Sequence, residues 1–186
     1  MEETPDVTII IVNTNDRVYI KDCLASLVHQ KGAPKLEIWV VDNNSTDGSI
    51  DFIKNSFPAV KLIKNHNNLL YTGANNCGLK KVRGKYFLIL NPDTRLPPKT
   101  IANIYQFMET HQRVGLAGAR QINEWGKTLP ICHRFFTPLT HMLLLPLFFR
   151  FAKHSSLLNA HEYSDWDRMI TRRVDAIPGS FMFGRC

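Results

Sequence analysis

The run Val7-Thr8-Ile9-Ile10-Ile11-Val12 decides the fold, together with the polar turn Asn13-Thr14-Asn15-Asp16 that follows it. A nearly continuous series of β-branched residues is typical of a strand buried on both faces, as in a parallel sheet. The turn holds good helix-capping residues, and apolar residues between 16 and 30 recur at helical spacing. The chain therefore begins with a strand, a turn and a helix.

Outward from this start, strand and helix patterns alternate as far as residue 119. We predict strands at 36–41, 60–63, 85–90 and 114–119, helices at 47–56 and 98–111, and a helix that follows the Gly- and Asn-rich stretch 70–78 and ends near 84. This alternation indicates βαβ units, so the predicted fold class is α/β, with a mostly parallel central sheet and flanking helices. After residue 120 we expect a hairpin within 121–129 and a late strand within 173–183.

Length and composition are those of one ordinary globular domain. The 186 residues match a usual domain size of about 100–200 residues. An apolar fraction of 44% with 21% charged residues excludes a disordered chain, a collagen-like fibre and a polytopic membrane protein. Every 18-residue stretch contains a charge or a proline, so we expect no spanning helix. Residues 1–6 lack the basic region that opens a secretory signal, which predicts a cytoplasmic location.

Positive charge is concentrated in the second half of the chain. Residues 1–93 carry 11 Lys or Arg and 10 Asp or Glu, whereas residues 94–186 carry 12 and 6. A basic half suggests an anionic partner, such as a diphosphate, an acidic lipid surface or nucleic acid; a solvated basic face is the alternative. Aromatic residues do not interleave the basic ones in any RNA-binding motif, so we expect no nucleic-acid partner. The four cysteines form no CxxC pair, which argues against a zinc site.

Polar side chains follow three of the predicted strands. The three strand ends are Asn13-Thr14-Asn15, Asp42-Asn43-Asn44 and Asn91-Pro92-Asp93. In open α/β sheets, ligands bind outside the carboxyl ends of the strands, so these groups mark the expected site. The sequence contains no GxGxxG, no GxxxxGK[ST] and no GxSxG motif, which argues against a dinucleotide-binding domain, a P-loop and a hydrolase of the nucleophile-elbow type.

Each candidate residue has a structural alternative. Asp93 suits a divalent cation held on a diphosphate, because Mg²⁺ commonly takes one or two carboxylates plus phosphate oxygens. Asp93 equally suits a turn, since Asn, Pro and Asp are turn residues. Asp42 could instead cap the turn that follows it, and Gly73 with Asn75 could form a tight turn entering a helix.

The ordered set of motifs resembles the N-terminal part of family 2 glycosyltransferases with the GT-A fold, and most closely the branch of bacterial rhamnosyltransferases. Five blocks in order carry this resemblance: Ile9–Asn13 with Asn15 and then Cys23–Leu27; Val40–Ser49; Asn68-Leu69 with Gly73–Gly78; Leu90–Thr94; and Val174-Asp175 with Gly179–Met182. The resemblance implies a Rossmann-like nucleotide-binding GT-A fold over residues 1–186, as a single domain. Residues 1–119 would form the nucleotide-sugar-binding half and residues 120–186 an incomplete acceptor-side half.

The resemblance also implies residue roles. Nucleotide binding is expected at Val12, Asn13, Asn15, Asp42, Asn44, Gly73, Asn75 and Asn91, and Asp93 would be the ligand of Mg²⁺ or Mn²⁺. The implied reaction is an inverting transfer of a sugar from a nucleotide-diphosphate donor, dTDP-rhamnose or a UDP-sugar. The acceptor would be a saccharide or a lipid-linked sugar in cell-surface polysaccharide synthesis. A base would deprotonate the acceptor while the metal neutralises the departing diphosphate.

Two positions and one motif depart from the family pattern. Asn91 stands where the family's first metal-site aspartate is common, and Leu69-Leu70-Tyr71 stands where Leu-Gly-Phe is common. The family's catalytic base lies some tens of residues after the strand of Gly179-Ser180-Phe181, so we expect the base beyond Cys186. We therefore assign none of Asp165, Asp167 and Asp175 as the base.

These departures leave other interpretations open. The chain could be a non-catalytic nucleotide-sugar-binding module or a truncated inactive fragment. A nucleotidyltransferase would need a glycine-rich basic loop after the first strand, and Asn13–Arg17 lacks the glycines. Residues 135–152 are apolar and flanked by arginines, which suits peripheral contact with the anionic inner face of a membrane. The alternative is that this segment packs over the sheet or against the rest of the protein.

Overall fold

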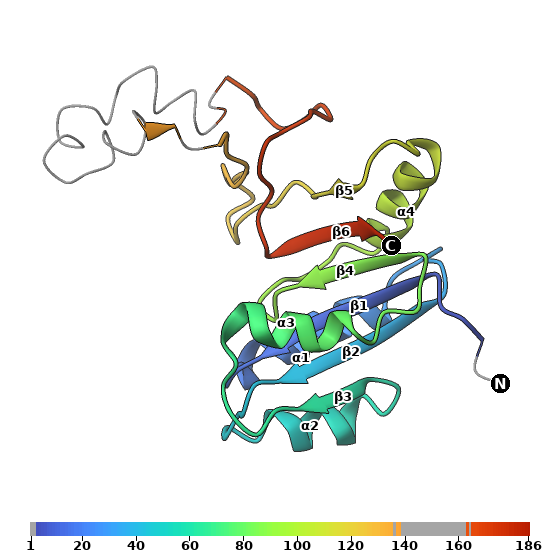
Figure 1. The fold of residues 1–186 in the computed structure, drawn as a ribbon, viewed down its shortest axis with the longest axis vertical. Helices are drawn as coiled ribbons and strands as arrows, with labels where there is room; N and C mark the ends of the chain where they lie inside the picture. Colours follow the sequence, from blue (N-terminus) through green and yellow to red (C-terminus); the bar gives the residue numbers. More distant parts are fainter. Residues whose placement is uncertain (1–2, 136, 139–162, 164) are drawn as a thin grey trace, which may run out of the picture. The chain divides into compact units, whose positions relative to one another are not determined.

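The computed structural model describes residues 3–135, 137–138, 163 and 165–186 (Figure 1). The chain divides into two compact units. The first unit is Met1–Ala117 with Gly179–Cys186, and the second unit is Gly118–Pro178. The first unit holds the sheet and the four helices described below, and the second unit holds a short hairpin.

A six-stranded sheet forms the centre of the first unit. Its strands are β1 (Val7–Asn13), β2 (Leu36–Asp42), β3 (Lys61–Lys64), β4 (Tyr86–Leu90), β5 (Leu116–Ala117) and β6 (Phe181–Arg185). Their order across the sheet is β3-β2-β1-β4-β6-β5. The strands β1 to β4 pair in parallel, and β5 and β6 add antiparallel pairs at one side. The predicted α/β class with a mostly parallel sheet is confirmed.

The strand order creates a crevice at the carboxyl ends of the central strands. Because β1 lies between β2 and β4, the strands that follow β1 are added first on one side and then on the other. The register brings Asn13 beside Asp42 and Ile11 beside Leu90, so the carboxyl ends of these three strands lie together. In open α/β sheets this topological switch point is where ligands bind.

Helices cover both faces of the sheet, with α3 in front of β1 and β2 and α1 behind them in Figure 1. The four helices are α1 (Arg17–Val28), α2 (Ser49–Ser56), α3 (Leu70–Leu79) and α4 (Thr100–Thr110). The predicted helix after residue 78 is wrong, because the Gly- and Asn-rich stretch is itself the helix and ends at Leu79. A Cβ on Gly78 would lie 2.4 Å from Cγ2 of Ile10, so this glycine allows α3 to lie directly on the sheet. Tertiary packing thus overrides a poor helix propensity.

Two late strands are shorter than predicted. β5 contains two residues instead of 114–119, because the Val114 N–H still bonds the carbonyl of His111 in the turn that leaves α4. β6 begins at Phe181 instead of residue 173, after Pro178, which has no N–H to donate to a ladder. The predicted hairpin is confirmed by a bridge between Ile122 and Thr128.

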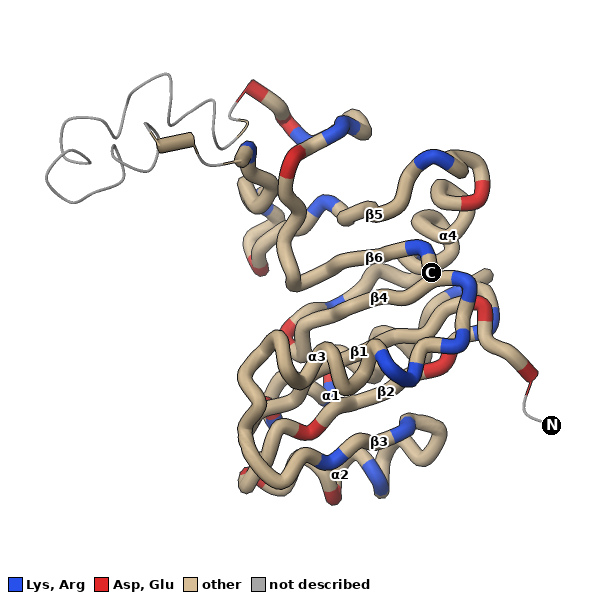
Figure 2. The backbone as a smooth tube through the Cα atoms, in the orientation of Figure 1, with Lys and Arg blue, Asp and Glu red and all other residues tan. Residues whose placement is uncertain are grey.

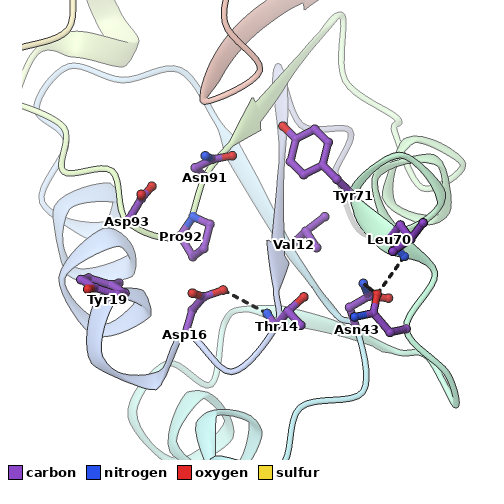
Figure 3. A pocket seen from close by; sticks show the side chains of 11 residues that line it. Val12, Thr14, Asp16, Tyr19, Asn43, Leu70, Tyr71, Asn91, Pro92 and Asp93 are labelled. Atoms are coloured by element: carbon purple, nitrogen blue, oxygen red, sulfur yellow. Dashed lines mark hydrogen bonds between the residues drawn. The ribbon is translucent and has the colours of Figure 1, made fainter. Parts of the chain in front are cut away.

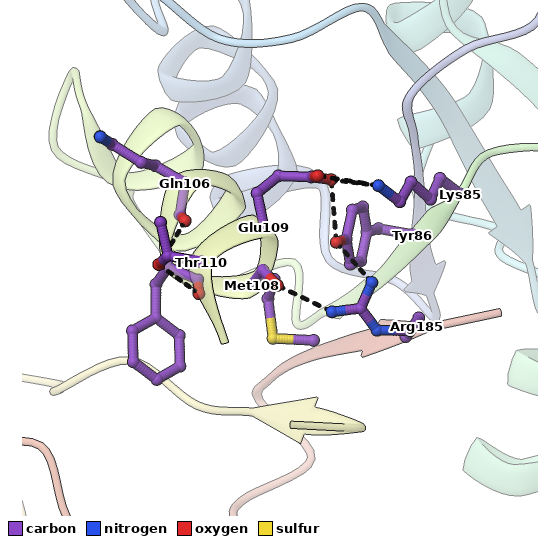
Figure 4. Close-up of polar contacts among 8 residues, drawn as sticks. Lys85, Tyr86, Gln106, Met108, Glu109, Thr110 and Arg185 are labelled. Carbon is purple, nitrogen blue, oxygen red and sulfur yellow. Dashed lines mark hydrogen bonds and ion pairs between the residues drawn. The ribbon is translucent and has the colours of Figure 1, made fainter. Parts of the chain in front are cut away.

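Polar contacts join β4, β6 and α4 at the end of the sheet away from the crevice (Figure 4). Glu109 on α4 accepts bonds from Lys85 Nζ at 2.6 and 2.8 Å and from the Tyr86 hydroxyl at 2.9 Å. Arg185 donates to the Tyr86 hydroxyl at 2.8 Å and to the carbonyl of Met108 at 2.7 Å. The hydrogen bond from Lys85 lowers the pKa of Glu109. This network ties the last strand to the core of the first unit.

The segment expected to contact a membrane, residues 135–152, lies almost wholly outside the described residues. Within the described ranges, no helix combines the length and the apolar character needed to cross a bilayer.

Candidate functional site

An open pocket of about 460 Å³ lies at the carboxyl ends of β1 and β4 (Figure 3). Its walls come from these strand ends, the start of α1, the end of β2 and the start of α3. The lining residues are Val12, Thr14, Asp16, Tyr19, Asn43, Asn68, Leu70, Tyr71, Asn91, Pro92 and Asp93. The pocket therefore occupies the switch point of the sheet, where the polar strand ends predicted it.

The pocket lining is acidic although the chain as a whole is basic. Asp16 and Asp93 both line it, and none of the described lining residues is Lys or Arg. The nearest arginines in sequence are engaged elsewhere, since Arg17 stacks on the ring of Phe52 at 3.6 Å and Arg95 pairs with Asp22. Figure 2 shows basic residues of the first unit gathered instead between α3 and β4. An anionic ligand in this pocket would therefore need a cation beside it.

Three of the predicted site residues line the pocket, namely Val12, Asn91 and Asp93. Asn91 follows β4, and its N–H donates to the carbonyl of Ser180 at 3.0 Å. Its own carbonyl accepts a 3.6 Å contact from the Cys23 thiol. Asp93 is exposed, so its carboxylate is accessible to a ligand.

Asn13 and Asp42 lie side by side at the ends of β1 and β2; both are fully buried, and neither lines the pocket. Asn13 Nδ2 donates to Ser45 Oγ at 2.9 Å, to Ser49 Oγ at 2.8 Å and to Asp42 Oδ1 at 3.4 Å. Asp42 Oδ1 also accepts the Ser45 N–H at 3.2 Å, as a turn-capping side chain does. Within the described part of the chain, Asn13 Oδ1 and Asp42 Oδ2 are buried acceptors without a hydrogen-bond partner. Their predicted contact with a nucleotide stays a prediction.

Asn15 and Asn44 shape the turns after β1 and β2. Both have positive φ angles, 60° and 67°, which asparagine tolerates better than most residues. Asn15 Oδ1 accepts the N–H of Thr46 at 2.8 Å, so one turn braces the other. Both side chains are exposed, and neither lines the pocket.

Gly73 and Asn75 lie on α3, where the tight-turn alternative does not apply. A Cβ on Gly73 would lie 3.0 Å from Cβ of Leu69. Asn75 is buried and donates to the carbonyl of Tyr71 at 2.9 Å. The α3 residues that line the pocket are Leu70 and Tyr71, one turn earlier.

Eight lining residues had no role in the prediction: Thr14, Asp16, Tyr19, Asn43, Asn68, Leu70, Tyr71 and Pro92. Thr14, Asn43 and Pro92 belong to the strand ends that marked the expected site, and the prediction missed the other five. The alternation of side chains along β2 could have identified Asn43. Successive side chains face opposite sides of a sheet, so Asn43 points away from the face on which Asp42 contacts Asn13. Asn43 Nδ2 instead donates to Asn68 Oδ1 at 2.6 Å, toward α3. Asp16 is the N-cap residue of α1 and Tyr19 lies in the first turn of that helix, which begins shortly after β1 ends.

The oxygen ligands of the pocket suit a divalent cation shared with a diphosphate. Asp93, Asp16 and Asn91 supply carboxylate and amide oxygens, which hard cations such as Mg²⁺ prefer. Among the described residues, no group of three or more His, Cys, Asp or Glu side chains could hold a metal ion. A cation that takes most of its ligands from phosphates and water needs only one or two protein carboxylates.

Comparison of the sequence with models of known protein families assigns this chain to a family. A model described as Glycosyl transferase family 2 matches residues 8–176. An uncharacterized glycosyltransferase of Haemophilus influenzae is 30% identical over 122 residues, which make up 64% of this chain and 38% of that protein. The Escherichia coli UDP-Glc:alpha-D-GlcNAc-diphosphoundecaprenol beta-1,3-glucosyltransferase WfaP is 34% identical over 107 residues, 57% of this chain and 42% of WfaP. The chain thus spans less than half the length of these relatives.

Solved structures show the same fold. Residues 1–349 of TarS from S. aureus superpose with a TM-score of 0.61 at 21% identity, over 70% of this chain and 41% of that one. The same TarS segment has been solved with UDP-GlcNAc. The mannosyltransferase PcManGT from Pyrobaculum calidifontis, in complex with GDP-Man and Mn²⁺, gives a TM-score of 0.56 at 26% identity, over 63% of this chain and 36% of that one. The GT-A fold expected from the sequence is confirmed.

Proposed function

Because this chain belongs to the family 2 glycosyltransferases, we propose that its pocket binds the nucleoside-diphosphate part of a sugar donor. The complete protein would transfer that sugar, with inversion, to an acceptor in the synthesis of a cell-surface polysaccharide. The observation that carries the proposal is the meeting of the β1 and β4 ends, with Asn91 and Asp93, at the switch point of the sheet.

The donor we propose is a UDP-hexose. The relatives support this choice, since the name of WfaP specifies UDP-Glc and TarS binds UDP-GlcNAc in a solved complex. The GDP-Man of PcManGT is the second candidate, and dTDP-rhamnose from the branch resemblance is the third. WfaP's name also specifies a diphosphoundecaprenol-linked acceptor, which supports a lipid-linked acceptor here.

Within the pocket we propose a division of roles. Asp93, with Asn91 and Asp16 near it, would hold Mg²⁺ or Mn²⁺, and that cation would supply charge neutralisation for the departing diphosphate. The ring of Tyr71 and the side chain of Leu70 would cover the nucleotide from the α3 side. For Asn13 and Asp42 we propose a contact with the nucleotide through Asn13 Oδ1 and Asp42 Oδ2, buried acceptors without a hydrogen-bond partner in the described part of the chain.

The catalytic base is not assigned to a described carboxylate. Asp165 is paired with Arg172 at 3.0 Å, and Asp175 accepts the N–H of Phe135 at 3.1 Å. We propose that the base lies beyond Cys186, in keeping with the greater length of the relatives.

Calorimetric titration with UDP, GDP and dTDP, each with Mn²⁺, with Mg²⁺ and with EDTA, tests this function. We expect UDP with Mn²⁺ to bind most tightly and EDTA to weaken binding. AMP with Mn²⁺ is the control for nonspecific phosphate binding. If no nucleoside diphosphate binds at millimolar concentration with either metal, the proposal is wrong. Tight binding of dTDP alone would move the donor to the rhamnosyl class.

A further inference from the structure

The segment that carries Asp93 has little regular structure of its own. It runs from Asn91, at the end of β4, to Thr100, where α4 begins, and contains three prolines. Proline has no backbone N–H, so this segment can form few internal hydrogen bonds. Figure 3 shows it passing beside α1. What holds Asp93 at the pocket must therefore come largely from neighbouring elements.

Side chains of α1 contact this segment on both sides of Asp93. Before it, the Cys23 thiol contacts the carbonyl of Asn91 at 3.6 Å. After it, Ser26 Oγ accepts the N–H of Leu96 at 3.1 Å, while its own proton goes to the carbonyl of Cys23 at 2.7 Å. Leu96 is buried, so an unpaired N–H there would cost free energy.

Gln30, just after α1, makes a two-sided contact with the same segment. Its Nε2 donates to the carbonyl of Pro97 at 2.8 Å, and its Oε1 accepts the N–H of Ile101 at 3.0 Å. Ile101 lies in the first turn of α4, and the N-cap residue Lys99 makes no side-chain capping bond. Since the first N–H groups of a helix lack partners within the helix, Gln30 caps α4 from another element.

The charges near α1 are compatible with these contacts between α1 and the segment that carries Asp93. Burial, together with the nearby charge of Asp93, raises the pKa of the Cys23 thiol to about 12. The thiol therefore remains neutral beside the carboxylate. The exposed ion pair between Arg95 and Asp22 also links the segment to α1, but pairs at the surface contribute little.

We propose that Ser26 and Gln30 are positioning residues: they fix the segment Asn91–Ile101 so that the Asp93 carboxylate is held at the pocket. This role rests on the proposed function, because it assumes that Asp93 serves a metal and a nucleotide. Neither side chain lines the pocket, so neither touches the ligand. Partners that orient a metal ligand typically change metal affinity by about 10- to 100-fold when they are removed.

The test compares Ser26→Ala and Gln30→Leu with the unmodified chain by two methods. Amide hydrogen exchange should become faster at Leu96 in the first variant and at Ile101 in the second. Calorimetry should show the affinity for UDP with Mn²⁺ reduced by about 10- to 100-fold, and the affinity in EDTA unchanged. Ser26→Thr keeps the hydroxyl and should restore both properties.

Tyr86→Phe is the matched control, because it removes hydrogen bonds to Glu109 and Arg185 at the other end of the sheet. It should lower stability and leave the metal-dependent affinity unchanged. The role is refuted if Tyr86→Phe weakens that affinity as much as Gln30→Leu, or if exchange quickens while affinity holds. Absence of metal-dependent binding in the unmodified chain would instead refute the proposed function, and the positioning role with it.

Discussion

The phenol hydroxyl of Tyr71 donates a 2.7 Å hydrogen bond to the backbone carbonyl of Gly179, 108 residues further along the chain. Tyr71 lines the pocket from α3, and Gly179 stands two residues before β6. The contact thus connects one wall of the pocket to the segment that enters the last strand. Burial raises the pKa of the Tyr71 hydroxyl above the ordinary value of 10.0, so the hydroxyl remains protonated well into the alkaline range.

This contact predicts a non-additive pair of substitutions. Tyr71→Phe should lower the free energy of unfolding by about 1 kcal/mol through loss of the hydrogen bond. Gly179→Ala should cost a similar amount, because its Cβ would lie 2.9 Å from the Tyr71 hydroxyl and displace it. The double variant should cost no more than either single one, since both remove the same bond. Urea denaturation of the four proteins measures this coupling, and additive losses would contradict it.

The sheet and the polar strand ends could be predicted because they depend on local pattern. The β-branched run of β1 is buried on both faces, and the prediction followed from that composition. The wall formed by Leu70 and Tyr71 could not be predicted in the same way. Gly73 and Gly78 disfavour a helix locally, and only contact with the sheet stabilises one there.

The candidate site was predicted in part for a similar reason. Motif order pointed to Asn91 and Asp93, and both line the pocket. It did not distinguish residues that line the pocket from residues that brace it, such as Asn15 and Asn44. For Asn15 and Asn44 that distinction depends on positive φ angles within the turns, which the alternation of side chains along a strand does not predict.

Asp93→Ala should abolish the metal dependence of nucleotide binding. Two carboxylates line the pocket, and Asp16 Oδ2 already accepts the N–H of Thr14, so the exposed Asp93 is the carboxylate on which a cation there would mainly depend. We expect the dissociation constant of UDP with Mn²⁺ to rise by about 10-fold or more, to the value in EDTA. Calorimetry measures this, with Asp51→Ala on α2 as a charge-matched control. A variant that keeps its response to Mn²⁺ would remove Asp93 from the metal site.

Asp42→Asn separates nucleotide contact from turn capping. An asparagine retains Oδ1, which accepts the Ser45 N–H, and replaces the unpartnered Oδ2 by an amide. If a ligand donor bonds Oδ2, nucleotide affinity should fall by about 1–3 kcal/mol with little loss of stability. Asp47→Asn serves as the charge-matched control, because Asp47 accepts the N–H groups of Arg17 and Ser49 at the same turn and does not line the pocket. Unchanged affinity in Asp42→Asn, with a lower melting temperature, would leave Asp42 a structural residue alone.

Glu37 predicts a pH-dependent contribution to stability. Burial by itself would raise its pKa, but hydrogen bonds from Arg83 at 2.5 Å and Lys61 at 3.1 Å lower the pKa overall. A lowered pKa in the folded state stabilises the fold above the unfolded value of 4.5, and this stabilisation disappears as the pH falls through the folded value. Glu37→Gln should therefore cost about 1–2 kcal/mol at pH 7 and progressively less below pH 4.5. A difference that stays constant from pH 7 to pH 3 would contradict this.

Leu70 combines a strained backbone with a place at the pocket. Its φ of 58° lies in the left-handed region, which costs residues other than glycine about 1–2 kcal/mol, and the residue is 74% exposed. Leu70→Gly should raise the free energy of unfolding by up to about 1 kcal/mol, since the relief of strain exceeds the added freedom of the unfolded chain. Leu70→Ala keeps the strain and should not stabilise.

Both variants of Leu70 remove the side chain that lines the pocket, so both should weaken UDP binding to a similar extent. Denaturation and calorimetry on this pair therefore separate the backbone from the side chain. If Leu70→Gly is destabilising, contacts of the leucine outweigh its strain; if UDP affinity is unchanged in both, the side chain does not cover the nucleotide.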